Sequence, residues 1–85
     1  MDTNKLERLA REGQLAETRE KLKESELRLT YIRDALRREL DPFEPVENLK
    51  VEAIKLMASD LLNHHRDYMK LLELEKKLCE ALGKE

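Results

Sequence analysis

The sequence contains few of the residues that build compact cores, sharp turns or covalent cross-links. Its 85 residues include no Trp, one Phe, two Tyr, one Cys, two Gly and two Pro. Charged residues make up 42% of the chain and hydrophobic residues 40%, a composition typical of long helices with much exposed surface. We expect a single domain. Because a chain of this kind buries little surface alone, its stability is expected to depend on self-association.

One cysteine and the lack of long apolar runs restrict the expected compartment. Cys79 has no partner for an internal disulfide, and its expected role is that of a small apolar residue on a helix. The first residues are charged, and no apolar run exceeds three residues. This pattern excludes a signal peptide and a transmembrane span. The default expectation is therefore a cytoplasmic protein that does not contact a membrane.

Groups for catalysis, metal binding or cofactor binding are also scarce. No glycine-rich loop is available to hold phosphate, and Cys79 lies 14 residues beyond His65, about 21 Å along one straight helix. His64 and His65 are adjacent, so they project about 100° apart on a helix. Asp60 and His64 share one face, but the Glu-x-x-His motif of bundle metal sites is missing. We expect no enzyme activity, no metal and no cofactor; a metal site would need the Asp60–His64 pair to converge across a dimer.

A repeat of seven residues is the clearest positive feature. The repeat and its intervening positions are Leu15, Thr18, Leu22, Ser25, Leu29, Ile32 and Leu36, and Phe43 continues the register. Apolar residues at this period form the seam of a coiled coil. Because Thr18 and Ser25 are polar, the seam predicts a specific partner helix rather than a simple two-stranded zipper.

Both prolines lie in the segment Leu40–Val46, which predicts the turn of a helical hairpin. Pro42 disfavours helical geometry at the preceding residue, whereas Pro45 suits the first turn of a new helix. Asn48 is a candidate N-cap, and Gly83 is the expected C-terminal stop. The predicted elements are a helix over about 3–40, a turn over about 41–47 and a second helix over about 48–83.

Gly13 is the weak point of the first predicted helix. A glycine inside a helix costs about 1 kcal/mol relative to alanine. Either the first dozen residues fray, or Gly13 lies where another backbone comes close. Ala10 and Ala16 place small residues on the neighbouring turns, which favours a continuous helix.

The second predicted helix carries a register that matches the first. Its members are Ile54, Met57, Leu61, His64, Tyr68, Leu71, Glu75, Leu78 and Leu82. Antiparallel folding then sets Leu29 opposite Leu61, with Leu36 opposite Ile54 and Leu22 near Tyr68. The same register predicts that His65 is buried opposite Ser25. The alternative for the adjacent His64 and His65 is that one is partly buried and the other lies in solvent. The predicted seam and self-association residues are Leu15, Leu22, Leu29, Ile32, Leu36, Ile54, Met57, Leu61, His65, Tyr68 and Leu72.

Further apolar residues widen the hydrophobic surface of the second helix beyond one seam. They are Leu49, Ala53, Leu56, Leu62, Met69, Leu72 and Leu74. One partner helix cannot cover both sets. We therefore predict an all-α, antiparallel two-helix coiled-coil hairpin that dimerises into a four-helix bundle, with helices about 50 Å long.

The densest group of basic residues is Arg33, Arg37 and Arg38. Acidic residues interleave with them, no aromatic residues are placed to stack on bases, and the net charge of the chain is −2. A solvated helix face is the favoured interpretation. A nucleic-acid patch formed by the three arginines is the alternative, and we expect nucleic acid not to be the partner.

Two segments carry a resemblance to a known group of proteins. The segments KLERLAREGQLAETR at 5–19 and LDPFEPVENL at 40–49, followed by a helix that ends in Leu-Gly, are similar to short two-helix proteins encoded in Mu-like prophages. The resemblance implies a bacterial or phage accessory protein and supplies no catalytic residue. The sequence thus predicts a protein-interaction or assembly module that forms a homodimer and binds an unidentified protein partner.

Overall fold

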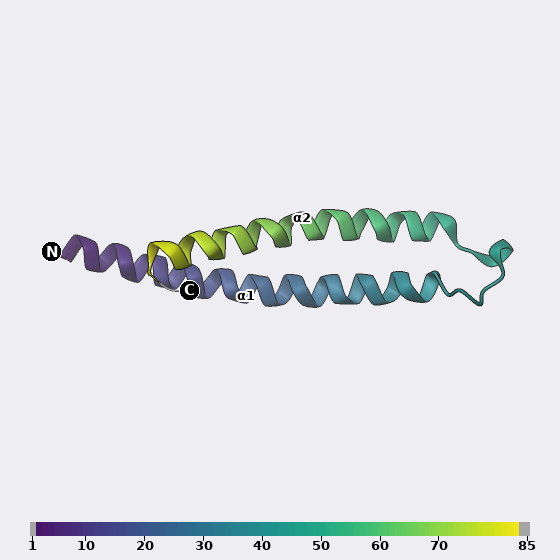
Figure 1. Cartoon of the computed structure of the whole chain (residues 1–85), viewed down its shortest axis with the longest axis horizontal. Helices are drawn as coiled ribbons and strands as arrows, with labels where there is room; N and C mark the ends of the chain where they lie inside the picture. Colours follow the sequence, from purple (N-terminus) through teal and green to yellow (C-terminus); the bar gives the residue numbers. More distant parts are fainter. Residues whose placement is uncertain (1, 84–85) are drawn as a thin grey trace.

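The computed structural model describes residues 2–83 and consists of two long helices packed antiparallel (Figure 1). Helix α1 spans Asp2–Glu39 and helix α2 spans Val51–Ala81, with the short 3-10 helix η1 at Val46–Asn48 between them. The molecule is a rod with extents of 69 × 17 × 15 Å. The predicted all-α, antiparallel hairpin is confirmed.

The loop between the helices begins with a proline-containing turn. The backbone amide of Glu44 donates to the carbonyl of Asp41 at 3.1 Å, and the amide of Phe43 donates to Oδ1 of Asp41 at 3.0 Å. Asp and Pro at these positions are the residues that favour such a turn, because the carboxylate accepts the local amide and the ring fixes φ. α1 therefore ends at the prolines, as the sequence predicts.

The start of α2 differs from the sequence-based expectation. α2 begins at Val51, the late end of the range from Pro45 to Val51 that the prolines predict and three residues after position 48, because η1 forms first and Leu49 then adopts an extended conformation. Asn48 lies inside η1, so the prediction that it caps α2 is wrong. The residue before α2 is Lys50, whose side chain makes no capping hydrogen bond.

The other end of α2 stops at a glycine. Gly83 has a positive φ of 71°, a conformation that side chains disfavour, and its amide donates to the carbonyl of Glu80 at 3.2 Å. The guanidinium of Arg8 on α1 donates to the carbonyl of Leu82 at 3.4 Å. A cation thus lies beside the negative end of the α2 dipole, although the last turn of α2 has no basic residue.

The tightest packing lies where α2 ends against α1. Leu15, Leu78, Cys79 and Leu82 form one buried cluster, with Leu74 packed against it. Leu22 is also buried, but the apolar seam residues nearer the loop are only half-buried. α1 continues beyond this end of α2 (Figure 1), which leaves Leu6 and Leu9 exposed.

Polar side chains in the seam have hydrogen-bond or ion-pair partners. Thr18 is only 3% exposed, and its hydroxyl donates to the carbonyl of Gln14 at 2.7 Å. Arg19 forms an ion pair with Glu75 across the helices at 3.1 Å, and its guanidinium donates to Sγ of Cys79 at 3.5 Å. These contacts allow a polar residue and a thiol to lie inside the seam without losing hydrogen-bond partners.

Gly13 lies within an uninterrupted helix, as the flanking alanines favour. A Cβ atom built at Gly13 meets nothing within 4 Å. Within the described part of the chain, the alternative prediction of a close backbone neighbour is therefore wrong. The helix is continuous because its neighbours on both sides are strong helix formers that offset one glycine.

Candidate interaction surface on α2

The predicted seam residues are buried or half-buried, with one exception. Leu15 and Leu22 are buried. Leu29 and Leu61 line one groove between α1 and α2, as the predicted pairing requires. The half-buried members of the predicted set are Leu29, Ile32, Leu36, Ile54, Met57, Leu61, Tyr68 and Leu72.

The exception is the histidine pair. His64 is half-buried and lines a groove with Ser25, whereas His65 is exposed. The prediction that His65 is buried opposite Ser25 is therefore wrong, and the interpretation with one partly buried and one solvated histidine is confirmed. The reason is helical geometry: position 65 projects about 100° away from position 64, so His65 lies at the exposed edge of the seam, where it lines a groove with Leu29 and Leu61.

His65 instead belongs to a second row of residues on α2, which we call the outer strip. The outer strip consists of Leu62, His65, Met69, Leu72 and Lys76. These positions are spaced by three and four residues, so they form one face of the helix beside the seam. Leu62 is 52% exposed and Met69 is 48% exposed. Within residues 2–83, α1 covers this face only in part: Leu72 is half-buried, and His65 lines a groove with Leu29 of α1.

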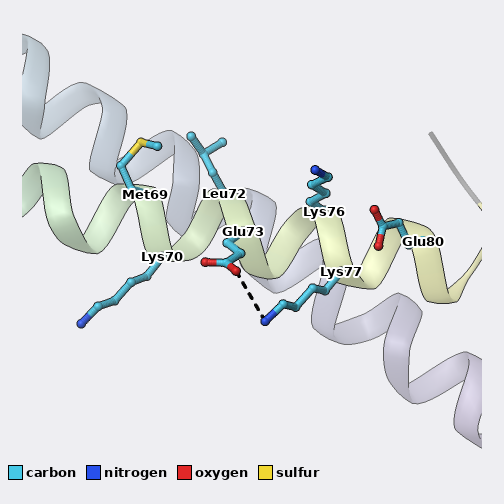
Figure 2. A pocket seen from close by; sticks show the side chains of 7 residues that line it. All are labelled: Met69, Lys70, Leu72, Glu73, Lys76, Lys77 and Glu80. Carbon is cyan, nitrogen blue, oxygen red and sulfur yellow. Dashed lines mark ion pairs between the residues drawn. The ribbon is translucent and has the colours of Figure 1, made fainter.

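The outer strip includes the apolar floor of a shallow groove (Figure 2). The groove is lined by Met69, Lys70, Leu72, Glu73, Lys76, Lys77 and Glu80. Met69, Leu72 and Lys76 project to one side of α2 in this view, and Lys70 and Lys77 project to the other. Glu73 pairs with Lys77 at 3.6 Å. An apolar floor with a charged edge is the usual composition of a protein-binding surface.

A separate apolar surface lies at the loop. Phe43 is 91% exposed and Val46 is 83% exposed. Three acidic residues, Asp41, Glu44 and Glu47, surround them, and no basic residue occurs from position 39 to 49. The loop therefore presents a single aromatic ring among acidic residues, and the backbone amide of Phe43 is bound by the carboxylate of Asp41.

The three arginines of the alternative site are exposed and lie among carboxylates. Arg33 pairs with Asp34 at 3.7 Å. Arg37 and Arg38 line a shallow depression together with Asp34, Asp41 and Pro42. The acidic neighbours reduce the positive potential that phosphate binding requires.

Sequence reasoning did not identify the role of Arg19. Among residues 2–83, the ion pair of Arg19 with Glu75 joins α1 to α2, whereas the other described ion pairs each join two residues of one helix. The sequence feature that could have predicted this pair is Glu75 at a seam position, because a half-buried carboxylate needs a cation nearby.

The described residues contain neither a candidate metal-binding group nor a membrane-spanning helix. No group of three or more His, Cys, Asp or Glu side chains is placed to hold a metal ion among the residues that the structure describes. Neither helix, over the described range, is long and apolar enough to cross a membrane.

Comparison with known proteins found no matching family model, no matching curated protein and no matching solved structure.

Proposed function

We propose that this chain is a non-enzymatic protein-interaction or assembly module that works as a self-associated helical hairpin. The observation that carries the proposal is the exposed apolar surface of α2. Leu62 and Met69 are about half exposed, although they lie in a row that continues into half-buried Leu72. Exposed apolar residues that form one continuous face indicate an interaction site, whereas scattered ones do not.

The small core supports self-association. Among the described residues, the buried apolar side chains are Leu15, Leu22, Leu78, Cys79 and Leu82, and none of them is completely buried. A two-helix chain with so few buried residues is marginally stable alone. Pairing of the outer strips of two copies buries Leu62, Met69 and Leu72 and forms a four-helix bundle, the common solution for helices with two apolar faces.

Light scattering after gel filtration at micromolar concentration tests this proposal. We expect a mass about twice the 10.1 kDa of one chain. Met69→Glu places a charge at the centre of the outer strip and should give a monomer. Asn63→Glu adds the same charge on a different, exposed face of α2 and should leave the dimer intact. A wild-type monomer, with a melting temperature independent of protein concentration, contradicts the proposal.

The loop is the part of this module that is best suited to another protein. An exposed aromatic side chain is a frequent anchor in interfaces. The charge around Phe43 suits a partner with an apolar pocket edged by lysine or arginine. A bacterial or phage accessory factor with an assembly role fits this arrangement, in line with the prophage resemblance.

Affinity capture from the native host, read by mass spectrometry, tests the loop. Phe43→Ala should lose a captured protein that the wild type retains, while Met69→Glu should affect the dimer. The matched control is Tyr31→Ala, because Tyr31 is another exposed aromatic residue, 71% exposed on α1. A protein captured equally by the wild type and by Phe43→Ala contradicts a role for the loop.

A further inference from the structure

We infer that two copies pair antiparallel along their outer strips, with the two-fold axis at Met69. This inference rests on the proposed self-association and adds its geometry. In such a pair, each residue lies opposite the position equally far from Met69 on the other side in the second copy, or within one residue of that position when both lie on the same edge of the strip. Met69 therefore faces its own copy at the centre of the interface.

Charge complementarity selects this register. Arg66 lies three residues before Met69 and Glu73 lies four residues after it. Both are exposed and border the same side of the outer strip, because seven residues make almost two helical turns. An axis at Met69 brings Arg66 of each copy beside Glu73 of the other, which gives two equivalent ion pairs. Within residues 2–83, Arg66 forms no ion pair, and the Glu73–Lys77 pair is solvent-exposed.

The apolar contacts are also compatible with this register. Leu62 faces Lys76 of the other copy, whose methylene groups can cover the leucine while the ammonium group remains in solvent. Leu72 faces His65 of the other copy. The groove of Figure 2 then holds the central Met69–Leu72 segment of the second α2.

Two competing arrangements are disfavoured by like charges. In an antiparallel pair centred between His65 and Arg66, Leu62 of one copy faces Met69 of the other. The arginines at position 66 of the two copies then face each other. This arrangement also sets Lys55 against Lys76. A parallel pair sets Lys55 and Lys76 each against its own copy. Like charges directly opposed in a helical interface are destabilising, so the arrangement with the axis at Met69 is preferred.

A charge-reversal experiment tests the register in the full chain. Arg66→Glu alone, and Glu73→Arg alone, place like charges across the axis twice. Each should raise the dimer dissociation constant by about tenfold in sedimentation analysis. The double variant Arg66→Glu/Glu73→Arg should restore the wild-type value, and an equal mixture of the two single variants should form heterodimers. Lys23→Glu is the matched control, because it makes the same charge reversal at an exposed position on α1 and should change little.

Cysteine cross-linking gives a second readout, with helicity monitored by circular dichroism. In a Cys79→Ser background, Met69→Cys should form a disulfide-linked dimer rapidly, because a residue on the axis meets its own copy within disulfide reach. Leu62→Cys should cross-link much more slowly. A wild-type dimer without charge rescue, or one that cross-links at Leu62 rather than Met69, overturns the register and leaves self-association intact. A wild-type monomer overturns both.

Discussion

The two ends of the hairpin are packed differently. At the open end, where α2 stops, Leu15, Leu78 and Leu82 are buried together, and the Arg19–Glu75 pair joins the helices. At the loop end, the apolar seam residues are half-buried, and Phe43 and Val46 are almost fully exposed. The chain connection therefore does not coincide with the tightest packing.

This difference separates stability from recognition. The open end contains the buried apolar contacts and so contributes most of the packing energy of the single chain. The loop end keeps the helices connected through local hydrogen bonds at Asp41 and leaves its apolar side chains available. Regions with few buried contacts are where binding residues commonly lie.

The largest expected effect is at the open end. Leu15→Ala should lower the free energy of unfolding by about 3 kcal/mol, because a 2% exposed leucine is replaced by a cavity. Leu36→Ala, at a half-buried seam position near the loop, should cost about half as much. Urea unfolding followed by circular dichroism, at one fixed protein concentration, measures both. An equal or larger loss of stability in Leu36→Ala would contradict the tighter packing of the open end.

The two glycines should respond in opposite directions. Gly83→Ala should destabilise the protein by about 1 kcal/mol, because the alanine must adopt a positive φ at the end of α2. Gly13→Ala should stabilise it by about 1 kcal/mol, because the added Cβ meets no atom within 4 Å. Thermal unfolding at matched concentrations compares them. Stabilisation by Gly83→Ala would contradict the role of Gly83 as the helix stop.

A smaller effect is expected at the turn. Asp41→Ala removes the acceptor for the amide of Phe43 and should lower stability by about 0.5–1 kcal/mol. Asp41→Asn keeps an acceptor oxygen and is the control that should retain most of the stability. Amide hydrogen exchange over residues 41–49 should speed up in the alanine variant alone. Unchanged exchange there would show that the hydrogen bond does not hold the loop.

No effect is expected from the arginines near the loop. Arg33, Arg37 and Arg38 lie beside Asp34 and Asp41, so we expect no DNA binding at about 150 mM salt, in wild type or in the triple alanine variant. Gel-shift assays from 50 to 200 mM salt, with duplex and single-stranded DNA, check this at salt levels where phosphate contacts change steeply. A salt-sensitive complex lost in the triple variant, with unchanged helicity, would favour the nucleic-acid alternative.

The candidate site was only partly predictable. The residues Leu62, Met69 and Leu72 follow from helical spacing, because a second apolar row on one helix needs a second cover. The exposure of His65 does not follow from composition, because two adjacent histidines differ only in their angle to the seam. The start of α2 was also missed, since η1 forms through its own local hydrogen bonds before Lys50.

The sequence alone determined the two long helices, the turn at the prolines and the antiparallel pairing, because heptad spacing and proline geometry act over short distances along the chain. The tertiary structure decided where the core lies. Burial at Leu15 and Leu82, the Arg19–Glu75 pair and the exposure of Phe43 depend on how far α1 extends past α2 and how closely the helices approach. The overlap of the two helices and the distance between them depend on both segments together, so a pattern within one segment cannot predict them.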